Sequence, residues 1–475
     1  MSDTNSSQVI QAFPAKRFFV DMLTRDIELL DAVLDLIDNS LDGAMRDSAK
    51  ENRMDGKKYQ DYKVDISFDS THFCIEDNCG GIPKQVAIHS AFRMGRPSSN
   101  IDADLPTVGV YGIGMKRSIF KMGRKCTVTS TTGDIILEVN ITPEWMARDD
   151  DWELPYTETS NSNRKSVGTK IHIEELKEGI KRSLGHGPGF FNDLKYAAEV
   201  YYSSFIEQGF KISINGQHVS SNANILAIEE NFLDKTEAIS PYVYVDHIDG
   251  VDISVMIGFY RSFASTEEEE DALQGHEKAK SVNAGVTIIC NDRVVLHADK
   301  TRVTGWGSFG VPSYHTQFVA ITGVVRFQSK DPSKLPLTTT KRGIEGNSEI
   351  YLKVKDRIME GLKLFTNFTN KWKSREGKEA LSIQSGKSIM MTTSEFSSKI
   401  PEHRWIKIRG QENTNAKKFI PDLPMPPKNS TERRISFSRP IEEINKIAEF
   451  YFEDNTVSPK EVGEKCFDES LKRAN

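Results

Sequence analysis

The stretch IELLDAVLDLIDNSLDGAM, residues 27–45, decides how the rest of this chain is interpreted. An α-helix advances about 100° per residue, so Asp35, Asn39 and Asp42 fall within a wedge of roughly 60° on one face. The opposite face is apolar and carries Leu30, Val33, Ile37 and Leu41. We therefore predict a long helix that packs into a core through its apolar face.

The polar face of this helix is unusual. Asp31 and Asp38 flank the wedge, and the stretch contains no Lys or Arg to neutralise its carboxylates. An exposed helix normally mixes its charges. An acidic face with one amide suits Mg²⁺ and an activated water. The alternative interpretation, which the stretch alone leaves open, is a solvated acidic surface.

Composition describes a globular chain. Its 475 residues predict two or three domains, with 37% apolar and 27% charged residues. No apolar run approaches the ~18 residues of a membrane span, and the polar N-terminus lacks a signal-peptide pattern. We expect no membrane association. The cysteines are scattered without a CxxC pair, which argues against zinc and disulfides and favours the cytoplasm. They are Cys74, Cys79, Cys126, Cys290 and Cys466.

Charge is distributed unevenly along the chain. The whole sequence has a net charge of −6, whereas residues 351–475 hold 24 basic and 18 acidic residues. A mildly basic tail on an acidic body fits contact with nucleic acid, and it equally fits a solvated linker.

A second motif follows the predicted strands KVDISF and HFCIED. It reads DNCGGIP from Asp77, with Gly80 and Gly81 before Ile82. Paired glycines allow the backbone to approach a flat ligand closely, and the Asp77 carboxylate can accept a hydrogen bond from an amine such as that of adenine. Thr169, at the start of the strand GTKIHIEEL, is placed to reach the same ligand. A plain Asp-Asn-Gly turn is the alternative.

A glycine-rich turn forms the third motif. Residues 91–108 have the Gly, Pro, Ser and Asp content of a mobile loop. The turn then leads into a helix, MKRSIFKMG, whose free N–H groups and positive dipole end suit a phosphate. The spacing fits neither the Walker A loop nor the dinucleotide GxGxxG motif, and a tight turn packed on a sheet is the alternative. The candidate phosphate contacts are Gly109, Tyr111, Gly112, Ile113, Gly114, Met115 and Lys116.

The chain divides into five parts in this interpretation. The fold class is α+β, and Asn215-Gly216 predicts a hairpin at the start of a second domain. In the second domain, LPLTTTKRG predicts an exposed loop that carries Lys341. The parts are a disordered N-terminus (1–12), a first domain (13–209), a second domain (210–373), a linker or extended segment (374–434) and a C-terminal helical region (435–475).

Taken in order, the three motifs resemble the GHKL ATPases, the Bergerat-fold family of gyrase B, heat-shock chaperones, histidine kinases and MutL. The resemblance spans roughly residues 15–365 and is closest to the MORC and MutL-like branch. The stretches that carry it are FRMGRPSSN, VGVYGIGMKRSIFKMGRK, GVTIICNDRVVL and TTTKRG. The resemblance implies a two-layer α/β-sandwich ATPase domain, an S5-like α/β transducer domain and a mostly helical C-terminal tail.

The resemblance also implies roles for individual residues. Asn39 would hold Mg²⁺ on the triphosphate of ATP, Asp77 would bind adenine with Gly81 and Thr169, and the turn that ends at Lys116 would wrap the phosphates. Lys341 would contact the γ-phosphate. The general base of the family is Glu, and Asp35 stands at its position here. Aspartate is one methylene shorter than glutamate, so this departure from the family pattern affects the expected rate of hydrolysis. Cys79 replaces the first glycine of the family's second motif.

We therefore expect an ATPase that binds and slowly hydrolyses ATP, and whose nucleotide state drives lid closure and homodimerisation. The expected role is an ATP-operated clamp on double-stranded DNA in genome defence or repair. The alternative is a chaperone-like or protein-remodelling ATPase. A histidine kinase is disfavoured, since no His precedes the acidic helix.

Overall fold

The computed structural model describes most of the chain's residues. They form two compact units, Met1–Pro424 and Met425–Asn475, each treated separately here. The predicted disordered N-terminus and residues 94–108 of the predicted loop lie outside the described residues. The described residues are 15–49, 57–93, 112–162, 166–222, 225–230, 232–263, 282–338, 341–373, 381, 387–408, 416–426, 435 and 437–474.

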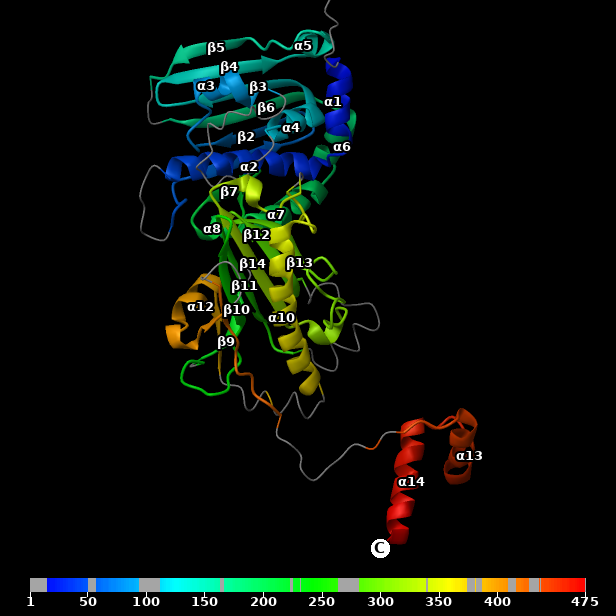
Figure 1. The fold of residues 1–475 in the computed structure, drawn as a ribbon. Helices are drawn as coiled ribbons and strands as arrows, with labels where there is room; N and C mark the ends of the chain where they lie inside the picture. Colours follow the sequence, from blue (N-terminus) through cyan, green and yellow to red (C-terminus); the bar gives the residue numbers. More distant parts are fainter. Residues whose placement is uncertain are drawn as a thin grey trace, which may run out of the picture. The chain divides into compact units, whose positions relative to one another are not determined.

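The first sheet of the larger unit has eight strands in the order β5-β4-β3-β6-β2-β1-β7-β8 (Figure 1). All neighbouring pairs are antiparallel except β1 and β7. The strands are β1 (Lys63–Phe68), β2 (Phe73–Asp77), β3 (Gly123–Thr131), β4 (Ile135–Ile141), β5 (Tyr156–Ser160), β6 (Gly168–Leu176), β7 (Lys211–Ile214) and β8 (Gln217–His218).

Helices cover one face of this sheet. Alternate residues of β1 and β6, such as Val64 and Ile171, are buried against them in one core. The other face carries partly exposed ion pairs, such as Lys125–Glu174. The result is a two-layer arrangement, as expected. The helices of this part are α1 (Lys16–Arg25), α2 (Leu29–Ser48), α3 (Lys84–Val86) with the π-turn Ala87–Ala91, α4 (Gly114–Met122), α5 (Pro143–Ala147), α6 (Glu178–Gly185), α7 (Gly189–Tyr201) and α8 (Ser203–Glu207).

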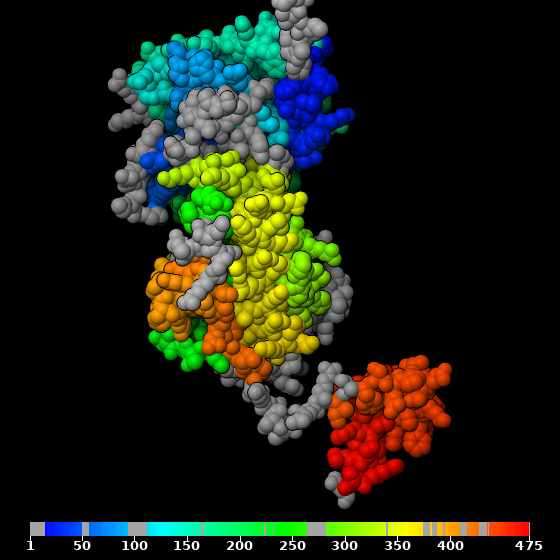
Figure 2. All heavy atoms as spheres, in the orientation of Figure 1, coloured from blue at the N-terminus to red at the C-terminus, as the bar shows by residue number. Residues whose placement is uncertain are grey.

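The second sheet has seven strands in the order β13-β12-β14-β11-β10-β17-β16. The long helix α10 packs on one face, and its surface is visible in yellow in Figure 2. Helix α12 and the β9–β15 pair cover the other face. The elements are β9 (Leu226–Glu229), β10 (Tyr242–Ile248), β11 (Val251–Phe259), β12 (Gly285–Cys290), β13 (Arg293–Asp299), β14 (Ile321–Ser329), α10 (Glu349–Lys371), β15 (Ser388–Met391), α12 (Thr393–Lys399), β16 (Ile406–Lys407) and β17 (Lys417–Phe419).

Two segments differ from the expected domain limits. The hairpin β7–β8 turns at Asn215-Gly216 as predicted, but β7 pairs with β1 in the first sheet instead of beginning the second domain. The reason is that Ile212 and Ile214 complete the core of the first sheet. The predicted linker or extended segment at 374–434 contributes β15, α12, β16 and β17, because Phe396 and Phe419 are buried against the second sheet.

The smaller unit contains α13 (Ile441–Phe452) and α14 (Pro459–Ala474). Ala448 and Val462 are buried, whereas Phe450 and Phe467 are exposed. No helix among the described residues is long and apolar enough to cross a membrane.

Candidate functional site

Helix α2 runs between the eight-stranded sheet and the part of the unit that holds the second sheet (Figure 1). It is buried on almost every side, and Asn39 is its one exposed residue between Leu29 and Ser48. The Asn39 amide has no hydrogen-bond partner among the residues that the structure describes. An open amide at the centre of a buried helix is placed to meet a ligand.

Three carboxylates of α2, those of Asp31, Asp35 and Asp38, are paired with cations, which corrects the expectation drawn from the stretch alone. Asp31 pairs with Arg342, and Asp35 pairs with Arg117 at 2.7 Å. Asp42 is buried and has a partner of its own. The cations come from other elements, so a scan of the helix sequence could not find them.

Asp77 lies at the end of β2, next to α2. Its Oδ2 accepts the Ser40 hydroxyl proton at 2.7 Å, and its Oδ1 accepts the backbone N–H groups of Cys79 (2.9 Å) and Thr169 (3.1 Å). Burial raises the Asp77 pKa, and these three hydrogen bonds oppose that rise. Asp77 and Thr169, which were predicted to reach the same ligand, are therefore neighbours, joined through the Thr169 backbone.

Glycines hold the backbone close around Asp77. A Cβ on Gly168 would lie 1.8 Å from the Asp77 carbonyl oxygen, and one on Gly43 would lie 2.6 Å from that of Cys79. Gly81 has a φ of 72°, and its Cβ would lie 2.4 Å from the Thr131 carbonyl oxygen. These positions require glycine, as expected for Gly81, whereas the motif search did not find Gly43 and Gly168.

Ile82 follows this turn and is fixed by the first sheet. Its N–H donates to the Ser130 hydroxyl at 2.7 Å, and that hydroxyl donates back to the Ile82 carbonyl at 3.0 Å. The half-buried Ile82 side chain packs near Leu137 and Val139. This reciprocal bond anchors the chain where the Asp77 turn leaves the site.

The glycine-rich turn ends against α2. Gly112 has a φ of 67°, Ile113 is the N-cap residue, and α4 begins at Gly114, one residue before the predicted helix MKRSIFKMG. A Cβ on Gly114 would lie 3.3 Å from Asp35 Oδ2, so this turn touches α2 one helical turn from Asn39. Met115 is half-buried against the core of the first sheet. Gly109 and Tyr111, also predicted to contact phosphate, lie outside the described residues.

Lys116 is buried and does not extend into open space. Its ammonium group donates to the carbonyls of Ala91 (2.8 Å), Arg93 (2.6 Å) and Gly112. Burial lowers the Lys116 pKa to about 8. In this position Lys116 joins Ala91 and Arg93 to Gly112, all within the predicted lid of residues 91–116.

Lys341 is held beside α2 by a buried ion cluster. Its Nζ lies 3.0 Å from Asp38 Oδ2, and Arg293 Nε lies 2.7 Å from Asp38 Oδ1. Burial would raise the Asp38 pKa, but the two cations outweigh it, and the pKa is lowered. The Tyr202 hydroxyl lies 3.0 Å from Asp38 Oδ1. Sequence reasoning missed Arg293; the available signal was an arginine at the start of an otherwise apolar strand.

The predicted site residues thus lie on α2 or in contact with it. Going along α2, Asp35 touches Gly114, Asn39 is open, Ser40 touches Asp77, and Gly43 touches Cys79. Residues 27–172 match the family described as histidine kinase-, DNA gyrase B-, and HSP90-like ATPase. This segment resembles a GHKL ATPase domain.

The match supports ATP binding and hydrolysis by this segment. It includes α2, the Asp77 turn, the glycine turn and Thr169, and it ends before Arg293 and Lys341. No curated protein matches the chain.

The arrangement fits a magnesium ion that arrives with ATP. Within the described residues, no group of three or more His, Cys, Asp and Glu side chains is placed to hold a metal. Asn39 offers one open oxygen, while Asp35 and Asp38 are paired with cations. Mg²⁺ commonly takes one or two protein ligands and completes its shell with phosphates and waters. Asn39 suits such a shared ion.

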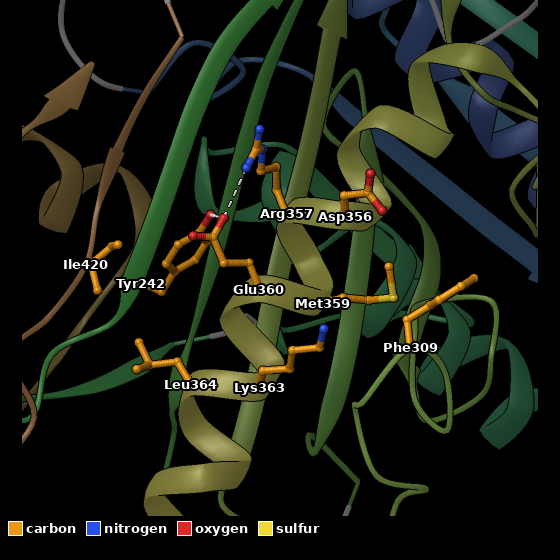
Figure 3. Close-up of a pocket in the computed structure, with 9 residues that line it drawn as sticks. All are labelled: Tyr242, Phe309, Asp356, Arg357, Met359, Glu360, Lys363, Leu364 and Ile420. Carbon is orange, nitrogen blue, oxygen red and sulfur yellow. Dashed lines mark hydrogen bonds and ion pairs between the residues drawn. The ribbon is translucent and has the colours of Figure 1, made fainter. Parts of the chain in front are cut away.

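A cavity of about 590 Å³ lies elsewhere, along α10 (Figure 3). Figure 3 shows Tyr242, Arg357 and Glu360 pointing toward one another, and the two partners lie 3.0 and 3.2 Å from the Glu360 carboxylate. Lys418 also pairs with Glu360. The lining includes none of the α2, β2 or α4 residues, and the Glu360 carboxylate already has protein partners.

Proposed function

We propose that this chain binds Mg·ATP over Asn39 and hydrolyses it slowly. The observation that carries the proposal is the exposure of Asn39 on an otherwise buried helix, between the Asp77 turn and the Gly114 turn. Asp77 accepts a hydrogen bond from the adenine amine, Asn39 holds Mg²⁺, and the turn from Gly109 to Lys116 wraps the phosphates. Lys341 contacts the γ-phosphate.

In this proposal Asp35 orients or deprotonates the attacking water. The Arg117 guanidinium, 2.7 Å from Asp35, competes with a water for the same carboxylate, which supports slow turnover. ATP orders residues 91–116 as a lid and brings a second copy of the chain to the first. The part that contains Lys341 acts as an S5-like transducer, as in the MORC and MutL-like branch.

The proposed ATPase activity is tested by a substitution that replaces one carboxylate oxygen with an amide nitrogen. Asp35→Asn keeps the shape of the side chain and removes its basicity, so we expect kcat to fall about 100-fold or more while the Kd for ATP stays within about threefold. Steady-state phosphate release and calorimetric titration measure the two quantities. The matched control is Glu138→Gln on the first sheet, which should change neither. Normal turnover by Asp35→Asn would exclude Asp35 as the base.

We further propose that the nucleotide state operates a clamp on double-stranded DNA, in genome defence or repair. Gel filtration with and without a non-hydrolysable ATP analogue tests homodimer closure. Binding to duplex DNA, measured at several salt concentrations, should be tighter with the analogue and weaken steeply with salt. Dimer closure without DNA affinity would favour the chaperone-like, protein-remodelling role instead.

A further inference from the structure

The buried ion cluster joins three segments that are far apart in sequence. Asp38 on α2 is fully buried, Arg293 on β13 is 1% exposed, and Lys341, between β14 and α10, is 10% exposed. The two cations divide the carboxylate between them, since Arg293 takes Oδ1 and Lys341 takes Oδ2. The cluster therefore has one carboxylate and two cations.

Arg293 also holds the backbone of Lys341. Its NH1 donates to the Lys341 carbonyl at 2.5 Å, and the Lys341 N–H donates to the Thr338 carbonyl at 2.9 Å. Lys341 has a φ of 55°, a left-handed conformation that a non-glycine residue keeps only when its surroundings impose it. The Lys341 backbone is thus fixed independently of the bond that its side chain makes.

We propose that Arg293 is a positioning residue that allows Lys341 to exchange Asp38 for the terminal phosphate of bound nucleotide. This inference rests on the proposed function, because it assumes that ATP binds over Asn39. In the exchange the Lys341 ammonium leaves Asp38 Oδ2 and bonds the γ-phosphate. Arg293 stays on Asp38 Oδ1, and no covalent bond or proton moves.

The charge balance explains why two cations are needed. A buried carboxylate that loses its only cation is destabilised by several kcal/mol, so Lys341 alone would be held on Asp38. With Arg293 and the Tyr202 hydroxyl in place, Asp38 remains charge-paired after Lys341 departs. The Arg293 bond to the Lys341 carbonyl keeps the loop in register while the side chain moves.

A purely structural ion cluster makes a different prediction. It would change stability when altered, and it would leave the relative affinities for ATP and ADP unchanged, since both nucleotides would meet the same folded protein. The exchange involves only the γ-phosphate, so it changes the ratio of the two affinities. This ratio separates the two explanations.

The experiment measures the Kd of Mg·ATP and Mg·ADP by calorimetry in full-length variants. Arg293→Met leaves Lys341 as the only cation on Asp38, so the preference for ATP over ADP should fall about tenfold while the Kd for ADP is unchanged. The double variant Asp38→Asn/Arg293→Met removes the acid as well and should restore the preference. Lys418→Gln, which breaks the separate Glu360 ion pair, is the control and should keep the wild-type ratio.

The outcomes are distinguishable. An unchanged ratio in folded Arg293→Met, or no restoration in the double variant, would overturn the exchange. If Arg293→Met does not fold, Asp38→Asn tests the same step: it releases Lys341, so the ATP preference should rise, and an unchanged preference overturns the inference. Failure of the wild-type chain to bind either nucleotide would overturn the proposed function itself. If Lys341→Met keeps the wild-type ratio of the ATP and ADP affinities, Lys341 does not contact the γ-phosphate.

Discussion

At the scale of single residues, one turn of α2 directs neighbouring side chains to different partners. The three residues concerned are Asp35, Asp38 and Asn39. Consecutive residues of an α-helix point about 100° apart. Asp38 therefore faces Arg293 and the second sheet, whereas Asn39 faces open space. Asp35, one turn earlier than Asn39, meets Gly114 and Arg117. The rotation lets a single helix touch the proposed ligand and the proposed γ-phosphate sensor on two different sides.

Lys116 gives a pH prediction at the same scale. Its pKa is lowered to about 8 in the folded protein, against an ordinary value of 10.5. Below pH 8 both the folded and unfolded states carry the proton, and the burial penalty is constant. Between pH 8 and 10.5 the unfolded state binds more protons, so this group makes the protein more stable as pH rises.

We therefore expect the free energy of unfolding of the wild-type chain, relative to Lys116→Met, to increase by about 2 kcal/mol between pH 7.5 and 9.5. Urea unfolding of both chains at several pH values measures it, and the subtraction cancels the other titrating groups. A difference that stays constant, or that decreases as pH rises, would show that Lys116 is not a buried cation.

At the scale of elements, the position of α2 depends on its close contact with the Asp77 turn. Most helix positions gain stability when Gly is replaced by Ala, because Gly loses more backbone entropy on folding. At Gly43 that gain is opposed by contact with the Cys79 carbonyl oxygen, 2.6 Å from the added Cβ. At Gly179, in α6, nothing lies within 4 Å of the added Cβ.

These two glycines form a matched pair. Gly43→Ala should destabilise the protein by about 1–3 kcal/mol and weaken ATP binding, because the turn that positions Asp77 must shift. Gly179→Ala should stabilise it by about 0.5–1 kcal/mol and leave ATP binding unchanged. Chemical denaturation and nucleotide titration measure both effects. Equal effects of the two substitutions would mean that the approach of α2 to the turn is looser than described.

At the scale of the whole molecule, the larger unit is completed by residues that the sequence suggested were a linker. Strand β17 pairs with β10, and Trp372 Nε1 donates to the Pro424 carbonyl at 3.2 Å. Phe396 and Phe419 are both buried in the cluster that covers the second sheet. Each buried Phe contributes about 1.5–3 kcal/mol, so this segment contributes substantially to stability.

Two truncations test this arrangement. A chain that ends at 426 should unfold cooperatively with a free energy within about 1 kcal/mol of the full chain, because its first unit is intact. A chain that ends at 373 should lose about 3–6 kcal/mol and aggregate, because burial of both Phe side chains is lost and the edge of β10 is uncovered. Thermal unfolding and light scattering measure the difference. Equal stability of the two chains would mean that residues 374–424 act only as a linker.

The sequence by itself determined the local features of this protein. The period of residues 27–45 placed α2, Asn215-Gly216 placed a hairpin turn, and the glycine turn placed the start of α4 to within one residue. These features depend on backbone conformation and on neighbours within a few residues, so the chain encodes them where they occur.

Only the tertiary structure decided how the acidic helix is neutralised and which sheet each strand joins. Arg117, Arg293 and Lys341 reach the α2 carboxylates across 82, 255 and 303 residues of sequence. Strand β7 joined the first sheet because its isoleucines fit that core, although its turn motif is equally compatible with either sheet. Long-range ion pairs and strand order are set by which surfaces meet on folding, and no local pattern records that choice.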